Sequence, residues 1–315
     1  MESSSQIANG PLKDASVALA VEAVTRGATA AKMRGSRKRR EVFKKLWLYV
    51  FLILGALTMV GPFLWMLTTS LKEPSQVFSF SKNWWEEWIP TSFVWQNYMK
   101  PWKVVPFARF YFNSIFVAIM VTLAQVGTSA MAAYPFARLT FPGRDKIFFG
   151  YLATMMVPGA VTMIPVFILL RYLGWVDSYK ALILPAAFTA YGTFMLRQFF
   201  LTLPKDLEDA AKIDGCSYLG IFWRIILPLS KPALATLTTF TFMGTWMNFM
   251  WPLIVLNTHE KFTLPVGLAY FQSLHHTDWT LLMAASMLMI IPILLVFIFN
   301  QRFFVEGIKL TGIKG

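Results

Sequence analysis

Side chains that could perform chemistry gather in one polar stretch of the chain, DLEDAAKIDGCSYLGIFWRIILPLSKP over residues 206–232. With Lys205 before it, the stretch holds four basic and four acidic residues, although the whole chain has a formal net charge of +13. Balanced charge and small side chains favour a surface that docks another protein over one that attaches to anionic lipid. An amphipathic connector between two membrane helices is the alternative interpretation.

Enzyme chemistry finds little support in the residue patterns. The sequence has no His-Glu-x-x-His pair, no Ser/His/Asp or Cys/His arrangement at a membrane boundary, and no Gly-Lys dipeptide from which a phosphate-binding loop could be built. One cysteine, Cys216, and three histidines cannot form a disulfide or a closed Cys/His metal site. We therefore expect a non-catalytic chain that holds no metal and no cofactor.

The polar stretch predicts two short helices joined by a bend. Acidic residues after Pro204 favour a helix start, and Gly215 is expected to end that helix in a left-handed backbone conformation. Asp214 or Ser217 can cap a second helix over residues 218–227, which Pro228 is expected to close.

The surrounding chain predicts an all-α polytopic membrane protein. Apolar residues make up 56% and charged residues only 14% of the 315 residues, against about 25% charged in soluble domains. Six segments have the length and the apolar character of transmembrane helices, and each contains a proline, which predicts kinked helices packed together. These segments are 47–69, 113–137, 147–170, 180–201, 233–256 and 280–300.

Basic residues predict the orientation. A cytoplasmic N-terminus places most of the 29 Lys and Arg residues inside, with both termini cytoplasmic. We expect residues 1–45 to be a largely disordered basic arm against anionic headgroups, without a role in nucleic-acid binding, and residues 46–315 to form the transmembrane domain. The outer loop 70–112 is rich in Trp and Tyr, as in an interfacial belt or a ledge for an external partner.

Polar side chains inside the segments are candidates for a solute pathway. The six segments contain no Asp or Glu, which disfavours transport coupled to protons or sodium. Neutral amides beside aromatic rings suit an uncharged sugar, and Trp246, Asn248 and Asn113 are the candidates. Pairing of an Asn with a backbone carbonyl of a neighbouring helix is the alternative for each amide.

The polar stretch also resembles a known motif. Its three clusters at fixed spacing are Asp209-Ala210-Ala211, three residues, Gly215, nine residues, Ile225, one residue and Leu227-Pro228. This pattern is similar to the Glu-Ala-Ala (EAA) loop in the permease subunits of bacterial ATP-binding-cassette (ABC) importers, with Asp209 in place of the usual Glu. The resemblance covers most of residues 47–315, with a core at about 109–301, and is greatest to the smaller, six-helix permease of maltose-type importers.

The resemblance implies a type I ABC importer permease fold in a bacterial inner membrane. In this family the EAA loop, here residues 204–231, couples the permease to a cytoplasmic ATPase dimer that binds the ATP. The residues carried over as ATPase contacts are Asp209, Ala210, Ala211, Asp214 and Gly215, and Leu227-Pro228 returns the chain to the membrane.

The resemblance also implies partners and a substrate class. We expect a second, homologous permease, an extracytoplasmic solute-binding protein and a carbohydrate substrate, in a subunit surrounded by membrane lipid. Import of glycerol 3-phosphate or a related polyol is the nearest alternative. A secondary carrier that works without ATP and a membrane-embedded enzyme are alternatives from other classes.

Overall fold

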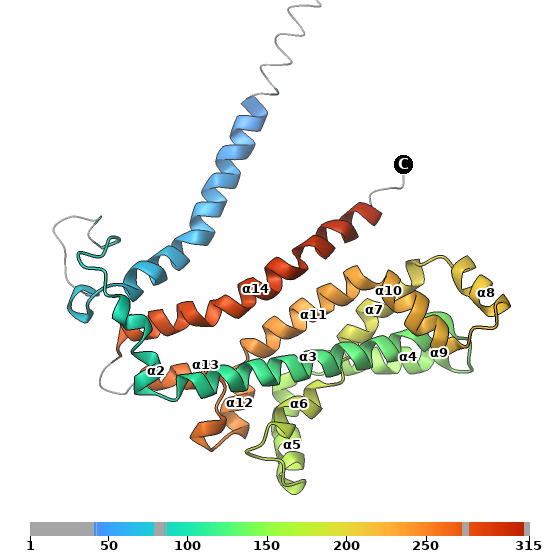
Figure 1. The fold of residues 1–315 in the computed structure, drawn as a ribbon. Helices are drawn as coiled ribbons and strands as arrows, with labels where there is room; N and C mark the ends of the chain where they lie inside the picture. Colours follow the sequence, from blue (N-terminus) through green and yellow to red (C-terminus); the bar gives the residue numbers. More distant parts are fainter. Residues whose placement is uncertain (1–40, 42, 79–84, 86, 273–276, 312–315) are drawn as a thin grey trace, which may run out of the picture. The chain divides into compact units, whose positions relative to one another are not determined.

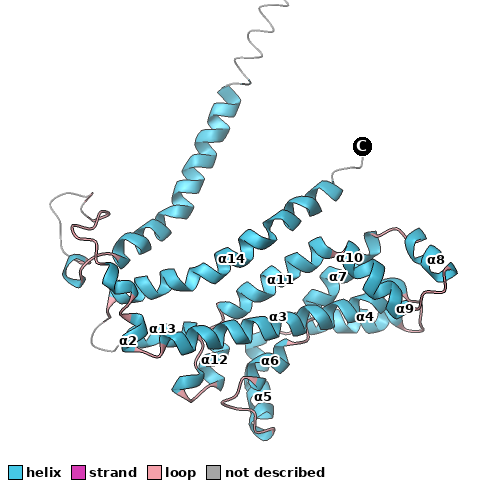
Figure 2. Ribbon diagram, viewed as in Figure 1, coloured by secondary structure: helices cyan, strands magenta, loops and turns pink. Residues whose placement is uncertain are grey.

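The structure is a computed structural model that describes residues 41, 43–78, 85, 87–272 and 277–311. This part of the chain consists of helices and loops, with one isolated bridge between Gln272 and Thr277 (Figure 2). The chain divides into two compact units, residues 1–65 and 66–315. Residues 1–40 and 42, most of the expected basic arm, lie outside the described residues.

The described part of the first unit is a single helix. It spans Phe43–Ser70, and its last residues belong to the second unit. No residue of its most apolar window is buried within the chain. Large apolar side chains in that state require lipid or a partner protein around them, which confirms the expected segment 47–69 as membrane-spanning in character.

The second unit is built on α3 (Phe107–Arg138), the long helix that packs against both α7 (Ala190–Thr202) and α11 (Lys231–Trp246). α11 in turn packs against α14 (Trp279–Thr311), and these helices run beside one another in Figure 1. The remaining α-helices are α2 (Pro101–Val104), α4 (Arg144–Ala153), α5 (Gly159–Tyr172), α6 (Lys180–Ala186), α8 (Asp206–Ile213), α9 (Tyr218–Ile221), α10 (Leu227–Leu229), α12 (Met250–Val255) and α13 (Leu264–Leu268).

Two apolar clusters hold the second unit together, and α3 contributes to both. One contains Phe107 and Phe110 from the first turns of α3 together with Trp246 from the end of α11. The other contains Ala133 and Tyr134 near the last turns of α3, packed with side chains of α7 and of the polar stretch. Because α3 passes through both clusters, it connects the two ends of the unit.

Several expected segments are interrupted, and the interruptions do not simply follow the prolines. The segment expected at 147–170 bends by 97° between Met156 and Gly159, where Pro158 precedes α5. Pro135, Pro165 and Pro292 lie inside helices that continue past them. Proline is tolerated within a membrane helix when neighbouring groups satisfy the freed carbonyl, so proline alone does not locate a break.

Two further segments consist of two helices each. Residues 180–201 are divided between α6 and α7, and residues 233–256 between α11 and α12. Thr128 on α3 donates a hydrogen bond of 2.5 Å to the carbonyl of Ala187 in the first break, so a neighbouring helix satisfies a carbonyl that the broken helix leaves free.

The number of spans therefore differs from the six segments expected. By length and composition, the described residues contain three helices able to cross a membrane. The number rises to five when each of two bent pairs counts as one span, namely Arg144–Met156 with Gly159–Tyr172 and Tyr218–Leu229 with Lys231–Trp246. α6 and α7 are only 7 and 13 residues long, so neither is long enough alone. The chain is an all-α, multi-pass membrane protein.

Candidate functional site

The polar stretch begins with α8 and turns sharply at Gly215. Three acidic residues occupy the first turn of α8, as expected of a helix N-terminus. Gly215 has φ +78°, its amide donates to the Lys212 carbonyl at 3.0 Å, and the Cys216 amide donates to the Ala211 carbonyl at 2.8 Å. This pair of bonds is a Schellman motif, and it confirms the left-handed glycine expected here.

The second half of the stretch is longer than expected. Ser217 caps it, because its hydroxyl accepts a hydrogen bond from the Gly220 amide at 3.2 Å. The helix then continues through a π-type segment, Phe222–Ile226, to Leu229. The expected closure at Pro228 is wrong, because Pro228 lies inside the last turn and the chain bends by 77° only at Ser230.

The residues assigned to ATPase docking lie mostly on the surface of this stretch. Asp209, Ala210, Asp214, Gly215 and Pro228 are exposed. Ala211 and Leu227 are partly buried against the second apolar cluster. Their role in docking stays a prediction, and the structure places them on one continuous bent segment at the end of α3.

Three large apolar side chains on the same stretch were not singled out from the sequence. Ile213, Leu219 and Trp223 are 86%, 71% and 63% exposed. Ile213 lies on the mostly polar helix α8, and Leu219 and Trp223 follow the bend at Gly215. Large apolar residues interspersed among the charged residues of this stretch are the signal that could have identified them. Aromatic and aliphatic anchors of this kind are typical of the centre of a protein interface.

Glu208 points the opposite way from its acidic neighbours. Its carboxylate oxygen Oε1 lies 2.8 Å from Nε of Arg138, and the two side chains are only 7% and 2% exposed. The same guanidinium donates through Nη2 to the Leu203 carbonyl at 2.7 Å. Arg138 is the last residue of α3 and Leu203 follows α7, so one guanidinium connects α3, α7 and α8.

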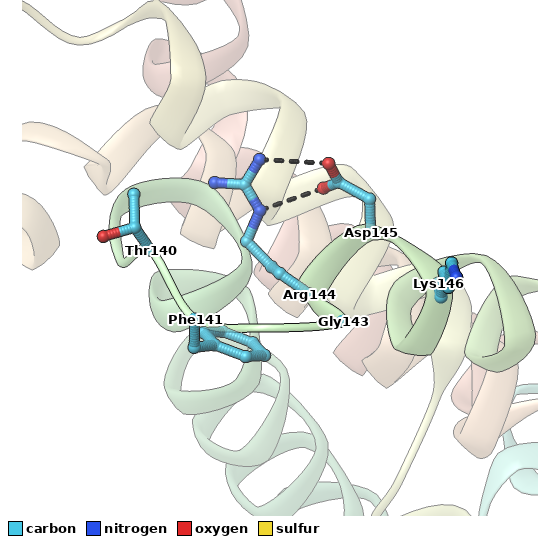
Figure 3. Close-up of a pocket in the computed structure, with 6 residues that line it drawn as sticks. All are labelled: Thr140, Phe141, Gly143, Arg144, Asp145 and Lys146. Carbon is cyan, nitrogen blue, oxygen red and sulfur yellow. Dashed lines mark hydrogen bonds and ion pairs between the residues drawn. The ribbon is translucent and has the colours of Figure 1, made fainter.

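A shallow pocket of about 360 Å³ lies at the turn between α3 and α4. Figure 3 shows Arg144 and Asp145 paired at its rim, with Nε of Arg144 2.9 Å from Oδ1 of Asp145. The Asp145 side chain is 72% exposed and the pair adjoins Arg197, whose Nη2 lies 3.8 Å from the same oxygen. Arg144, Asp145 and Arg197 thus form a small group of paired, mostly exposed charges beside this pocket.

A different pocket, of about 260 Å³, opens between α3, α7 and α11. Hydrogen-bonding side chains and one aromatic wall dominate its lining, and none of the described residues that line it carries a charge. The lining residues are Gln125, Tyr191, Phe240, Thr241, Gly244, Thr245 and Asn248. Polar groups of this kind are unfavourable against lipid, so this surface requires water, a solute or another protein against it.

A smaller cavity of about 60 Å³ adjoins this pocket, and Thr245 and Asn248 line both. The Thr241 hydroxyl at the pocket and the Thr263 hydroxyl at the cavity are buried and have no hydrogen-bond partner among the described residues. Buried hydroxyls are normally hydrogen-bonded, so each of these two can still form a hydrogen bond.

Asn248 lies in the break between α11 and α12, where the sequence suggested a continuous helix. Its Oδ1 accepts a hydrogen bond from the Trp251 amide at 3.4 Å, as a residue before a helix N-terminus does. Pro252 lacks the amide hydrogen that would bond to the Asn248 carbonyl in a continuous helix. The break thus places the Asn248 side chain at the pocket that Gln125 and Tyr191 also line.

Comparison with known proteins identifies the family. Residues 125–309 match the family described as binding-protein-dependent transport system inner membrane component. The chain belongs to this family. An arabinooligosaccharide transport permease of Bacillus subtilis is 35% identical over 86% of this chain and 96% of that protein. A sn-glycerol-3-phosphate transport permease of Yersinia enterocolitica is 33% identical over 84% of this chain and 95% of that protein.

The fold of this permease is also that of solved importers. A chain of a bacterial ABC transporter for the acidic polysaccharide alginate superposes with a TM-score of 0.75 at 24% identity, covering 84% of this chain and 98% of that one. A second structure, of the bacterial alginate transporter in complex with an alginate pentasaccharide-bound periplasmic protein, gives a TM-score of 0.59 at 13% identity. Both likenesses establish the fold.

The other two candidate pathway residues of the permease are occupied with structural contacts. Trp246 is 1% exposed, stacks on Phe242 and donates from Nε1 to the Met289 carbonyl at 3.0 Å. Asn113 is 4% exposed and donates to the carbonyls of Glu260 and Phe262 at 2.8 and 2.9 Å. Neither lines the 260 Å³ pocket, and the backbone pairing weighed for Asn113 is what the structure shows.

Proposed function

We propose that this permease forms, with a second permease, the path by which a carbohydrate enters the cell, and that its bent polar stretch couples the path to a cytoplasmic ATPase. The observation that carries the proposal is the α8–Gly215–α9 bend, a continuous segment that exposes most of the motif residues together with the large apolar side chains of Ile213, Leu219 and Trp223. The permease itself is then a non-catalytic subunit, and ATP is bound by the partner.

An uncharged sugar suits the pocket better than an anion does. Amide, hydroxyl and aromatic groups hydrogen-bond and stack with sugars, whereas a phosphate is typically held by Arg or Lys. Since relatives include both an arabinooligosaccharide and a glycerol-phosphate permease, the uncharged lining of the 260 Å³ pocket is what favours a sugar over glycerol 3-phosphate.

The proposed function also implies which side of the membrane each part of the permease faces and where a solute-binding protein docks. The basic clusters support a cytoplasmic position for both termini and for the polar stretch. An external binding protein then delivers the sugar to the opposite side, where the segment between the first helix and α3 exposes aromatic side chains such as Trp95 and Trp102.

The bend at Gly215 provides the test of coupling. Replacing Gly215 with Val forces a β-branched residue into a left-handed conformation, which costs roughly 1–2 kcal/mol and distorts the bend. Space is available, since a Cβ added at Gly215 meets nothing within 4 Å. We expect Gly215→Val to insert normally and to recover about tenfold less ATPase when the tagged permease is purified.

Gly174 offers a matched control. It has φ +67°, sits in an equivalent Schellman motif after α5, and has equally open space around its Cβ position. Gly174→Val imposes the same backbone strain outside the polar stretch and should leave ATPase recovery unchanged. Equal recovery from Gly215→Val and the unsubstituted chain would refute the coupling role.

A further inference from the structure

We propose that the buried ion pair between Arg138 and Glu208 is the joint that transmits movement of α8 to the membrane helices α3 and α7. The inference rests on the proposed function, because it requires α8 to be displaced by a docked ATPase. Arg138 and Glu208 are positioning residues in this account, since neither needs to touch solute or ATPase.

The pair is the main attachment of α8 to the rest of the permease. Glu208 is the only residue of α8 that is fully buried, and Ala211 contributes a partly buried contact to the second apolar cluster. Leu207 and Ile213 are exposed, by 45% and 86%, and point away from that cluster. Because α8 has so little apolar contact, packing alone does not make it move together with the helices beside it.

Residues with non-helical backbone conformations flank α8 at both ends. Before it, Leu203 has an extended backbone conformation, and after it Gly215 is left-handed. Non-helical residues on both sides permit rotation of a short helix as a unit, as hinge residues do. The ion pair therefore decides whether α8 turns by itself or together with α3.

The geometry of Arg138 suits a joint. Its planar guanidinium contacts the Glu208 carboxylate through Nε and the Leu203 carbonyl through Nη2, so it fixes α8 relative to the ends of both α3 and α7. The Nε–Oε1 approach of 2.8 Å is an ion pair and not an aligned hydrogen bond, while the bond to Leu203 is aligned. A buried pair seldom stabilises a fold more than apolar side chains do, so directional positioning is the reason we assign to it.

The second half of the polar stretch packs against α3 through Tyr134, one helical turn before Arg138. Tyr134 and Phe222 have ring centroids 5.3 Å apart, and Phe222 is 2% exposed. Tyr134 and Arg138 are four residues apart and lie on one face of α3. The two halves of the stretch thus attach to adjacent sites on the same helix, one through rings and one through charge.

The test measures coupling in the whole complex. The permease is reconstituted in vesicles with its partner permease, ATPase and binding protein, and both ATP hydrolysis and uptake of a labelled sugar bound by that protein are measured. Glu208→Gln keeps the side-chain shape but removes the charge. We expect normal ATPase recovery and an increase of about tenfold in ATP consumed per sugar imported, a typical size for coupling between two sites.

A double substitution separates positioning from folding. Glu208→Gln alone leaves Arg138 charged and buried, which can impair folding, whereas Arg138→Gln with Glu208→Gln leaves no unpaired buried charge. The proposal predicts the same raised ratio in both, because both break one joint. Asp145→Asn is the control, since its exposed carboxylate also faces arginines, but these are Arg144 of α4 and Arg197 of α7 and not residues of α8.

Two results would overturn the proposal. One is an ATP-to-sugar ratio like that of the unsubstituted complex in the double variant, and the other is failure of the double variant to assemble, because the pair then serves folding alone. Absence of ATP-dependent uptake by the unsubstituted complex is a different outcome, and it would refute the proposed function instead.

Discussion

The left-handed backbone of Gly215 depends on neighbouring residues in the sequence, whereas the burial of Glu208 depends on a distant helix. A glycine seven residues after Glu208, between an acidic first turn and Ser217, predicts a left-handed helix end from local chemistry alone, and the structure has φ +78° there. Glu208 and Asp209 look alike in sequence, yet one is buried against Arg138 and the other is 64% exposed beside Lys212. Only tertiary packing decides which carboxylate turns inward.

Of the three candidate pathway residues, only one lies at the 260 Å³ pocket, because tertiary packing also decides where these side chains point. Asn248 lies at the pocket, but Trp246 and Asn113 make their contacts inside the subunit. Gln125 and Tyr191 complete the pocket and were not identified from the sequence, although Gln125 is a polar residue in the middle of an apolar segment. Such a residue is unfavourable in lipid, and that was the available signal.

Gly244 allows the pathway to be tested without removing any contact. It lines the 260 Å³ pocket, and a Cβ added there meets nothing within 4 Å. Gly244→Leu therefore fills part of the pocket while the helix is retained. We expect sugar uptake to fall by about tenfold or more, the scale set by misfitted methylene groups in a binding pocket, with binding-protein-stimulated ATP hydrolysis retained.

Gly127 on α3 is the matched control for that prediction. A Cβ added at Gly127 also meets nothing within 4 Å, but Gly127 is not among the residues that line the pocket. Gly127→Leu should leave uptake near that of the unsubstituted permease. Unchanged uptake in Gly244→Leu, measured beside Gly127→Leu at equal protein levels, would exclude the pocket from the path.

At the scale of elements, the apolar segments were predictable and their interruptions were not. Segment 113–137 became the single helix α3, whereas 180–201 and 233–256 are each two helices. Composition shows which segments of a chain are apolar. Whether a membrane helix can be interrupted depends on whether a neighbouring group hydrogen-bonds the carbonyl that the interruption leaves free, as Thr128 does for Ala187. Both divided segments contribute to the pocket, in line with the use of discontinuous helices at transport sites.

The loops after α5 and α12 are tied together by Asp177. Its carboxylate accepts hydrogen bonds from the Asn257 and Thr258 amides, both at 2.9 Å, and from Nζ of Lys261 at 2.9 Å. Partial burial by itself raises the pKa of the Asp177 carboxyl, but the hydrogen bonds from Thr258, Lys261 and Asn257 outweigh it and hold that pKa well below its usual range.

The lowered pKa of Asp177 predicts a pH-dependent stability. A carboxyl with a depressed pKa in the folded state stabilises above its unfolded pKa of about 3.9, and this contribution is lost as the pH falls below that value. Asp177→Asn tolerates the observed φ of 59° and should lower the free energy of unfolding by about 1 kcal/mol at neutral pH.

Thermal unfolding of the detergent-solubilised permease measures this effect. The difference in melting temperature between the unsubstituted chain and Asp177→Asn should be constant above about pH 5 and shrink below about pH 4. A difference that persists unchanged at pH 3 would show that the charge of Asp177 does not tie the two loops.

At the scale of the whole molecule, much of the apolar surface of the described membrane helices is not buried by other described residues. The helix Phe43–Ser70 has no buried residue in its most apolar window, and in α3 only 33% of the corresponding window is buried. Lipid covers part of such a surface, and the proposed second permease covers part. The family matched over residues 125–309 is an inner membrane component of a transport system that depends on a binding protein.

Uptake in sealed vesicles distinguishes an importer driven by ATP from a carrier that works without it. Vesicles containing the permease and its partner permease are compared with and without the ATPase, with binding protein outside and ATP inside, using a sugar chosen by thermal shift of the binding protein. The account predicts accumulation of the sugar only when the ATPase, ATP and binding protein are all present. Robust sugar flux through the permeases without the ATPase would contradict it and favour a carrier that works without ATP.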